Sequence, residues 1–419
     1  MNVLIVGSGG REHAIAASVA KSPRADKIFC APGNAGIAEY AQCVPIGAME
    51  FDKLRDFAKE NAIDLCIVGM DDPLVGGLVD VLEEAGIRTF GPKKNAAILE
   101  GSKAFSKDLM KKYNIPTAAY ENFTDPKAAV AYLETAKFPI VLKADGLALG
   151  KGVLICKDLE EAKAGVKEIM LDKKFGTAGN EMVIEEFMTG REVSVLSFVD
   201  GKTIKTMTSA QDHKRAGDGD TGLNTGGMGT FSPSPFYTKE VEEFCEKYVY
   251  QATVDAMAAE GRPFKGVIFF GLMLTEDGPK VLEYNARFGD PETQIILPRL
   301  TSDFAQNITD ILEGKEPAIT WTDKGVTLGV VVASNGYPLA YEKGVKLPAK
   351  TEGDIITYYA GAKFAENGQD LLSNGGRVYM LVTTADTVKD GQNIIYNELD
   401  KQNTEGLFYR NDIGSKANK

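Results

Sequence analysis

The sequence is poor in the residues that build zinc sites, disulfide networks and membrane spans. Among 419 residues it has only two histidines, His13 and His213, and five scattered cysteines that form no CxxC pair. A Cys/His zinc site is therefore not expected, and the thiols indicate a reduced, cytoplasmic chain. No stretch approaches about 18 consecutive apolar residues, and the opening MNVLIVGSGG lacks the basic start of a signal peptide. We therefore expect neither a membrane span nor a leader.

Positive charge is also in short supply. Lysine and arginine number 47 against 59 aspartates and glutamates, which gives a formal net charge of −12. Such a surface repels nucleic acid and anionic lipid, so neither is expected as a partner. Any phosphate ligand must be held by local groups of lysine, arginine and backbone N–H. Glycine, by contrast, is abundant at 44 residues, above the usual background of about 7%.

Apolar spacing divides the chain into regions of different character, and the length suits roughly three domains. Residues 1–100 alternate between strand and helix patterns, which predicts a parallel, doubly wound α/β sheet. The middle region is expected to be α+β, with hairpins that turn at 200–201 and 276–279. A connector at 313–324 leads to a small α+β region, 325–419. The expected strands are 3–6, 28–30, 65–70, 139–144 and 152–156, and the expected helices are 11–20, 51–62, 73–85 and one beginning at Asp125-Pro126.

The first glycine-rich segment, Gly7-Ser8-Gly9-Gly10, lies between an expected strand and an expected helix. A dinucleotide fingerprint needs GxGxxG, and here Glu12 occupies the third glycine position, so the match fails. The N–H groups of a helix start beside Arg11 still form an anion site. The alternative is a plain strand–helix turn.

The second glycine-rich segment runs from Gly146 to Gly152 and includes Gly150 and Lys151. It is not a Walker A motif, because only three residues separate its first two glycines and no Ser or Thr follows the lysine. A strand is expected on each side, so the segment is a hairpin loop that could cover phosphates, with Lys143 at the preceding strand end. The alternative is a surface hairpin with solvated lysines.

The third segment, QDHKRAGDGDTGLNTGGMG at 211–229, holds six glycines between residues 217 and 229. It begins with a charged run that includes Asp212, Lys214 and Arg215, and later presents Asn224 and Thr225. A disordered linker is one interpretation. A loop of this length inside a compact domain is also typical of a functional site, and its charges, amides and glycines suit wrapping around a polar, anionic ligand.

A candidate metal site lies in the segment KVLEYNAR, which is expected to be the return strand of a hairpin. Because side chains on a strand alternate between faces, Glu283 and Asn285 point the same way. Two hard oxygen ligands on one face suit Mg²⁺, which completes its shell with water and phosphate. Arg287 follows on that face and could clamp a carboxylate or a phosphate. The alternative is a solvated strand face.

Taken together, these segments resemble the phosphoribosylamine–glycine ligase family of the ATP-grasp superfamily. GSGGREHA, APGNAG, KADGLALGKGV, EEFMTGREVSV, QDHKRAGDGDTGLNTGGMG, EYNARFGDPETQ and VVASNGYP occur in the family's order and span essentially the whole chain. The resemblance implies an N-terminal substrate-binding domain over 1–101 and an ATP-grasp domain over 102–322, with a mobile lid at about 122–190. A C-terminal domain over 323–419 completes the expected architecture.

The resemblance also implies roles for individual residues. ATP phosphates are assigned to Lys103, Lys143 and the 146–152 loop, the adenine to the hinge Glu185, Glu186, Phe187 and Met188, and the ribose to Glu192. The metal ligands are Glu283 and Asn285, and the residues assigned to catalysis are Asp212, Lys214 and Arg287. The remaining positions expected near the substrates are Gly9, Gly10, Arg11, Glu12, Gly33, Asn34, Asp71, Arg215, Asn224, Thr225, Gly226 and Asp290.

One departure from the family pattern is visible. Where the family has a PEAP-like segment, this chain reads Met70-Asp71-Asp72-Pro73, so Asp71 stands as a shortened version of the family's glutamate. Any substrate contact made at this position is therefore in question, whereas the reaction class is not.

The resemblance implies ATP-dependent ligation of glycine to 5-phosphoribosylamine in purine biosynthesis, through a glycyl phosphate and with Mg²⁺ or Mn²⁺. We expect a cytoplasmic monomer, with transient contacts to neighbouring purine-pathway enzymes as an option. Three alternatives stay open at this point: an ATP-grasp ligase with other substrates, a nicotinamide-dependent oxidoreductase and a nucleotide sensor. The missing third glycine argues against the oxidoreductase, and a metal pair beside a lid argues against a mere sensor.

Overall fold

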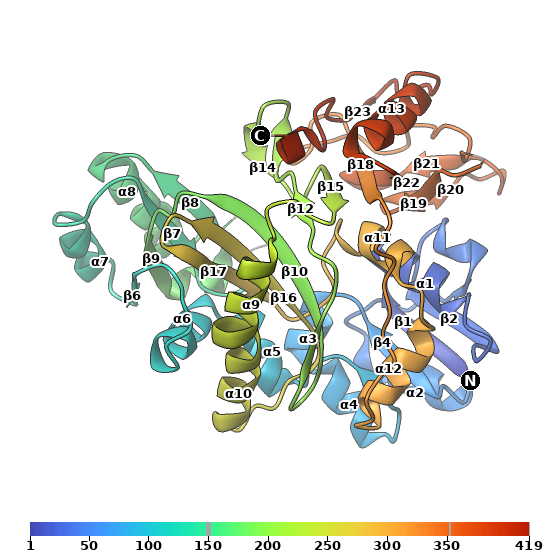
Figure 1. Ribbon diagram of the computed structural model, residues 1–419, viewed down its shortest axis with the longest axis horizontal. Coiled ribbons are helices and arrows are strands. Elements are labelled where there is room, and N and C mark those ends of the chain that lie inside the picture. Colours follow the sequence, from blue (N-terminus) through green and yellow to red (C-terminus); the bar gives the residue numbers. More distant parts are fainter. Residues whose placement is uncertain (148–151, 352, 419) are drawn as a thin grey trace.

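The computed structural model describes residues 1–147, 152–351 and 353–418 (Figure 1). The N-terminal part is a five-stranded parallel sheet in the order β3-β2-β1-β4-β5, as the alternating pattern predicts. Residues Val3 to Val6 of β1 have no exposed surface, because helices cover both faces of the sheet. Its strands are β1 (Asn2–Gly7), β2 (Lys27–Pro32), β3 (Gln42–Cys43), β4 (Leu65–Val68) and β5 (Thr89–Phe90), and its longer helices are α1 (Gly10–Val19), α2 (Phe51–Glu60) and α5 (Lys94–Gly101).

One expected helix of this region is divided. The single helix predicted at 73–85 is wrong, because the structure has α3 (Asp71–Gly76) and α4 (Leu78–Glu84) instead. Gly77 between them takes a φ of +100°, in the left-handed region that ends one helix and redirects the chain into the next.

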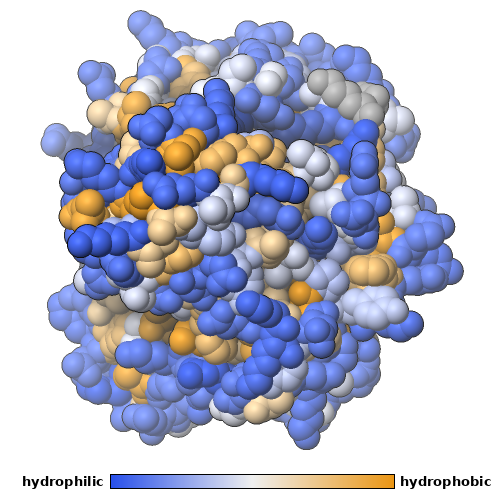
Figure 2. All heavy atoms as spheres, turned by 90° about the vertical axis from the view of Figure 1, so that its left-hand side faces the viewer, coloured by the Kyte–Doolittle hydropathy of each residue, from blue (hydrophilic) through white to orange (hydrophobic). Residues whose placement is uncertain are grey.

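The segment from β6 to β9 forms a four-stranded antiparallel sheet in the order β6-β9-β7-β8. The helix expected at Asp125-Pro126 is confirmed, since Asp125 accepts a hydrogen bond from the Lys127 N–H at 3.0 Å and caps it. Hydrophilic residues prevail on the face that carries this region, with apolar residues in small patches (Figure 2). The elements are β6 (Tyr120–Phe123), β7 (Ile140–Ala144), β8 (Val153–Cys156), β9 (Met182–Glu186), α7 (Pro126–Leu133) and α8 (Leu159–Val166).

A second four-stranded antiparallel sheet, β11-β10-β16-β17, lies at the centre of the molecule (Figure 1). It contains both expected hairpins, β10–β11 and β16–β17. Its core side includes Phe270, whose ring contacts Tyr250 and Tyr284 edge-on. The elements are β10 (Arg191–Asp200), β11 (Ile204–Thr206), β16 (Lys265–Thr275), β17 (Gly278–Asn285), α6 (Lys103–Lys112), α9 (Lys239–Cys245) and α10 (Gln251–Ala259).

The C-terminal sheet has six strands and recruits part of the third glycine-rich segment. The strand order is β12-β15-β18-β22-β19, and β23 pairs with β18. Strands β12 (Gln211–Asp212), at the start of that segment, and β15 (Gly229–Ser232), which begins at its last residue, lie at one end of the sheet. Between them lies a two-stranded hairpin, β13 (Arg215–Gly217) and β14 (Thr221–Asn224), so the segment is ordered rather than a disordered linker. The other elements are β18 (Val326–Ser334), β19 (Ile356–Tyr359), β20 (Ala362–Phe364), β21 (Leu371–Ser373), β22 (Arg377–Ala385), β23 (Leu407–Phe408), α11 (Thr293–Ile296), α12 (Phe304–Leu312) and α13 (Val388–Leu399).

Two further observations bear on the sequence-based expectations. All five cysteines are free thiols. Among the helices that the structure describes, none is long and apolar enough to cross a membrane.

Candidate active site

Lysines from three segments act on the carboxylate of Glu283. Lys214 Nζ lies 3.5 Å from Glu283 Oε1 and 2.8 Å from Glu192 Oε2. Lys214 is the main cause of a pKa of about 2 for Glu283, with Lys143 and Lys103 adding to it against the opposing effect of burial. Glu283 is therefore ionised at every physiological pH. The structure thus brings together these lysines from α6, β7 and the third glycine-rich segment around β17.

The strand geometry of the predicted metal pair is as expected. In β17, Glu283 and Asn285 pair with Gly271 and Phe269, two residues apart on the neighbouring strand. Asn285 Oδ1 accepts a hydrogen bond from Arg287 Nη2 at 3.2 Å. Among the described residues no group of three or more His, Cys, Asp or Glu could hold a metal ion. One carboxylate and one amide oxygen still suit Mg²⁺ or Mn²⁺, which fills its other positions with water and phosphate oxygens.

The two predicted phosphate lysines are held by local partners. The N-cap Ser102 places Lys103 in the first turn of α6, where its Nζ donates to the Gly146 carbonyl at 2.7 Å. Burial lowers the pKa of Lys103. Lys143, at the end of β7, is 5% exposed and lies 2.7 Å from Glu185 Oε1. Its Nζ also donates to the carbonyl oxygen of Leu282 at 3.3 Å, beside Glu283.

The glycine loop between these lysines and β8 is only partly within the described chain. Gly146 takes a φ of +94°, and the carbonyl of Gly152 accepts a hydrogen bond from the Ala144 N–H at 2.8 Å. Gly150 and Lys151 lie outside the described residues.

A small apolar cluster adjoins the charged centre. It consists of Ala118, Met188 and Met273, with Leu282 packed against it. Both methionines are 8% exposed, and Met273 is the cross-strand partner of Glu192. An apolar surface beside a carboxylate suits the nucleobase and the ribose of a nucleotide.

The four predicted hinge residues face different ways. Glu185 is buried against the lysines, whereas Met188 belongs to the apolar cluster. Phe187 is 38% exposed. Glu186 accepts a hydrogen bond from the Ala119 N–H at 3.1 Å and lies 3.7 Å from Lys280.

Glu12 shapes the first glycine loop from inside the protein. Its carboxylate has no exposed surface and accepts hydrogen bonds from the Gly9 N–H and from Arg11 Nε, both at 2.6 Å. A Cβ atom on Gly7 would collide with the Glu12 side chain at 2.5 Å, and one on Gly69 would collide as well. Arg11 also donates to the Phe288 carbonyl at 3.0 Å. The side chains of Arg11 and Glu12 therefore hold the loop in shape through contacts inside the protein. The backbone of the loop is the part that can contact a ligand.

Asp290 joins all three parts of the molecule. Its Oδ2 accepts a hydrogen bond from the Arg11 N–H at 3.3 Å, and its Oδ1 lies 3.1 Å from Arg377 Nη1. Arg377, in β22, also donates to the Gly226 carbonyl at 2.8 Å. Arg377 was missed by sequence reasoning, and an arginine in an apolar C-terminal strand offered no signal. The N-terminal loop is tied to the same region through Asn34, which donates to the Ser8 and Tyr359 carbonyls at 2.8 and 3.0 Å.

Buried polar atoms near this junction lack partners within the described chain. They are Asp212 Oδ1, Arg287 Nε and Gln294 Oε1. Burial, with Glu292 as its neighbour, raises the pKa of Asp212 well above its ordinary value. Arg287 Nη2 lies 3.2 Å from Glu100 Oε1 and 4.0 Å from Asp71 Oδ2. Unpaired buried donors and acceptors are the groups that a polar substrate would satisfy.

Two of the predicted substrate residues lie further out. Arg215 and Asn224 are cross-strand partners in the β13–β14 hairpin, and Arg215 donates to the Gly222 carbonyl at 2.8 Å. This hairpin lines an open groove of about 640 Å³ against Tyr337 and Tyr409. Thr225 instead closes onto Lys214, since its hydroxyl donates to the Lys214 carbonyl at 2.8 Å.

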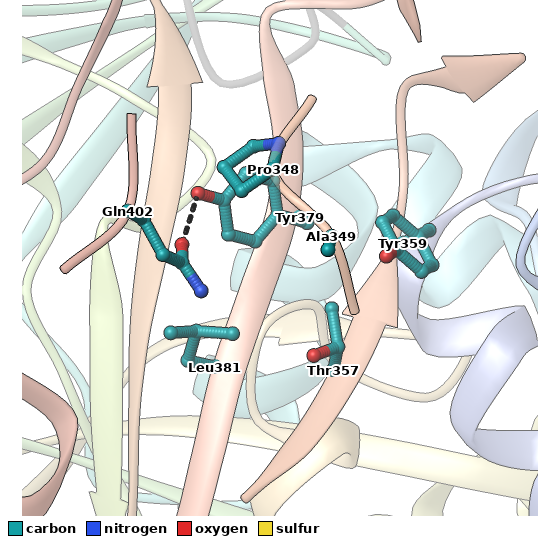
Figure 3. Close-up of a pocket in the computed structure, with 7 residues that line it drawn as sticks. All are labelled: Pro348, Ala349, Thr357, Tyr359, Tyr379, Leu381 and Gln402. Atoms are coloured by element: carbon teal, nitrogen blue, oxygen red, sulfur yellow. Dashed lines mark hydrogen bonds between the residues drawn. The ribbon is translucent and has the colours of Figure 1, made fainter. Parts of the chain in front are cut away.

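A cavity between β19, β22 and the segment at Gln402 is too small for a substrate (Figure 3). Tyr379 donates its hydroxyl hydrogen to Gln402 Oε1 at 2.8 Å across it. Its volume of about 10 Å³ is room for about one water, so it is a packing gap and not a substrate site.

Comparisons with known proteins agree with this architecture. The family described as phosphoribosylglycinamide synthetase matches with its N domain at 1–100, its ATP-grasp (A) domain at 101–293 and its C domain at 327–416. A phosphoribosylamine–glycine ligase of Streptococcus pneumoniae is 59% identical over 418 residues, covering 100% of both chains. The crystal structure of phosphoribosylamine–glycine ligase from Thermotoga maritima is 33% identical, with a TM-score of 0.86, and the match covers 99% of this chain and 100% of that one.

A more distant structure shows the shared fold alone. The biotin carboxylase of Campylobacter jejuni is 13% identical, with a TM-score of 0.76, over 97% of this chain and 92% of that one. ATP-grasp ligases use ATP with divalent metal ions. From the three matched domains and the full-length identity, the chain belongs to the phosphoribosylglycinamide synthetase family, the phosphoribosylamine–glycine ligases, and is an ATP-grasp ligase.

Proposed function

We propose that the chain joins glycine to 5-phosphoribosylamine in two steps at the centre around Glu283. First, a carboxylate oxygen of glycine attacks the γ-phosphorus of ATP, and the bond to the β-phosphate oxygen breaks to give glycyl phosphate and ADP. The amine of phosphoribosylamine then attacks the acyl carbon, the C–O bond to phosphate breaks, and the amine proton is lost. The products are glycinamide ribonucleotide, ADP and phosphate, in purine biosynthesis.

The observation that carries this proposal is the group of lysine ammonium groups around Glu283, beside a small apolar cluster. Lys103 and Lys143 would bind the triphosphate. Both lower the pKa of Glu283, so their ammonium groups lie near the proposed metal ligand, and Lys143 is almost fully buried. Met188 and Met273 would contact the adenine, and Glu192 would accept from the ribose hydroxyls. This chemistry is mostly positioning and charge neutralisation, so a preorganised charge cluster is what it requires.

The metal would be Mg²⁺ or Mn²⁺, held by Glu283 and Asn285. Their oxygens share one face of β17 next to Lys143, and Arg287 fixes the amide by donating to its oxygen. The ion would offset the negative charge of the ATP phosphates during transfer of the γ-phosphoryl group.

The substrates would occupy the region between the first glycine loop and the Gly226 segment. Arg287 and Asp212 carry buried atoms that need partners, which suits a carboxylate and an amine respectively. Lys214 would offset the negative charge of bound substrates next to Glu283. The residues that would line this region are Gly9, Gly10, Arg11, Glu12, Gly33, Asn34, Asp71, Thr225, Gly226 and Asp290, with Arg215 and Asn224 at its edge.

The domains would divide at 101/102 and 322/323, with the lid at about 122–190. The enzyme would work as a monomer, and its place would be the cytoplasm, a reducing compartment that the five free thiols suit.

The test is an ADP-release assay with ATP, Mg²⁺, glycine and freshly generated phosphoribosylamine, with each component omitted in turn. ADP release that requires glycine, together with product formation that requires phosphoribosylamine, is the expected result. Full ADP release with another carboxylate in place of glycine would point to a different ATP-grasp ligase and contradict the proposal. Mn²⁺ should replace Mg²⁺ in the same assay.

A further inference from the structure

Three charged side chains form a row of buried ion pairs beside the proposed ATP site. One of them, Lys107, has no role in the reaction described above. Lys107 Nζ lies 2.9 Å from Glu185 Oε2, and Lys143 Nζ lies 2.7 Å from Glu185 Oε1. The side chains of Lys107, Glu185 and Lys143 are only 3%, 2% and 6% exposed. One carboxylate is thus shared by two ammonium groups, and the trio carries one excess positive charge.

The two lysines differ in their freedom to leave Glu185. Lys107 also donates to Thr117 Oγ1 at 2.8 Å, and that hydroxyl donates to the Val281 carbonyl at 2.7 Å, so Lys107 is fixed between α6 and β17. Lys143 instead has the Leu282 carbonyl as its second partner, next to the carboxylate of Glu283. Lys143 therefore faces the proposed phosphate site, and Lys107 lies behind it.

Moving Lys143 from Glu185 to a phosphate would leave a buried carboxylate behind. An unpaired buried charge is strongly unfavourable, because its lost hydration is not replaced. Lys107 removes this obstacle, since Glu185 keeps a full ion pair with it after Lys143 departs. The excess positive charge of the trio is then neutralised by the anionic ligand.

We propose that Lys107 is a positioning residue that retains Glu185 and so releases Lys143 to bind the phosphates of ATP. This inference rests on the proposed binding of ATP at Lys143. Without Lys107, Glu185 and Lys143 would form a neutral one-to-one pair, and ATP would have to break it. The cost falls on ATP binding and not on the attack by glycine or the amine.

The experiment compares steady-state kinetics of K107M, K107M/E185Q and K143M with the wild type. K107M should raise the KM for ATP by about tenfold or more, while the KM for glycine and kcat stay within about twofold. In K107M/E185Q the buried carboxylate is gone, so the KM for ATP should return to within about threefold of the wild-type value. Lys111, an exposed lysine one turn further along α6, provides the control K111M, which should change nothing.

The outcomes separate this inference from the function on which it rests. If K143M leaves the KM for ATP unchanged, the proposed phosphate site fails and this inference fails with it. If K143M weakens ATP binding but K107M does not, only the role of Lys107 is overturned. A merely structural role would lower kcat and the melting temperature without a selective change in the KM for ATP, and the second substitution would not rescue it. Should K107M not fold, the double variant decides: a tenfold rise in its KM for ATP overturns the proposal.

Discussion

Replacing Glu283 with glutamine removes one negative charge at the site and leaves the size of the side chain almost unchanged. Lys214 keeps its ion pair with Glu192 at 2.8 Å, so its ammonium stays in place in the variant. The side chain of Glu283 is 36% exposed, and the pair with Lys214 at 3.5 Å is partly screened by solvent. The free energy of unfolding should therefore fall by less than about 1 kcal/mol.

The effect on the reaction should be much larger. Because the pKa of Glu283 is held near 2, the wild-type group is fully charged in any assay near neutral pH. The substitution deletes that charge and one of the two proposed metal ligands, and an amide oxygen is a weaker ligand. A loss of about 3 kcal/mol of transition-state stabilisation corresponds to about a 100-fold fall in kcat.

The assay is ADP release at saturating ATP, glycine and phosphoribosylamine, with Mg²⁺ titrated until the rate no longer increases. Glu276 lies in the exposed turn of the same hairpin, so E276Q is the matched control and should behave as wild type. A kcat for E283Q within about threefold of wild type at saturating Mg²⁺ would refute the ligand role and the reasoning built on it.

Three further predictions follow from other contacts. R377A removes the bonds from β22 to the Gly226 carbonyl and to Asp290, so kcat/KM should fall at least about tenfold; unaltered kinetics would show that this junction does not position the site. G69A places a methyl group against the buried Glu12 and should lower the free energy of unfolding by about 1–3 kcal/mol in urea denaturation; no change would mean that the loop relaxes freely. Burial lowers the pKa of Lys107 from 10.5 to about 8, so between these values the unfolded chain holds a proton that the folded chain has lost. The stability of wild type relative to K107M should therefore rise with pH over that window, and a constant difference in melting experiments would contradict the assigned pKa shift.

Sequence reasoning succeeded where the signal is local. The apolar spacing of 1–100 gives the parallel sheet, and the Asp125 cap and the hairpin turns come from residue types with fixed backbone preferences. The one helix that was wrong failed at Gly77, because a glycine inside a helical pattern does not by itself reveal a left-handed conformation.

The site was less accessible to such reasoning. Period-two alternation correctly placed Glu283 and Asn285 on one face, but their neighbours come from distant segments. The contact of Arg377 with Asp290 joins residues 87 positions apart, and no local pattern encodes it. The position of Lys107 is partly indicated by the sequence, because it follows Lys103 by one helical turn and so lies on the same face of α6.

The C-terminal sheet includes β12 and β15, which come from a much earlier part of the chain. This arrangement limits where the enzyme can be divided into stable fragments. Residues 229–232 pair with β18, and Met228 and Phe231 lie fully buried in the core that β18 and β22 build. A fragment starting at 327, where the C-domain match begins, would lose both side chains and bare one hydrogen-bonding edge of β18. Such an edge invites pairing with other chains, so the fragment should aggregate on expression. Separating the terminal module would require grafting the 209–234 segment onto it.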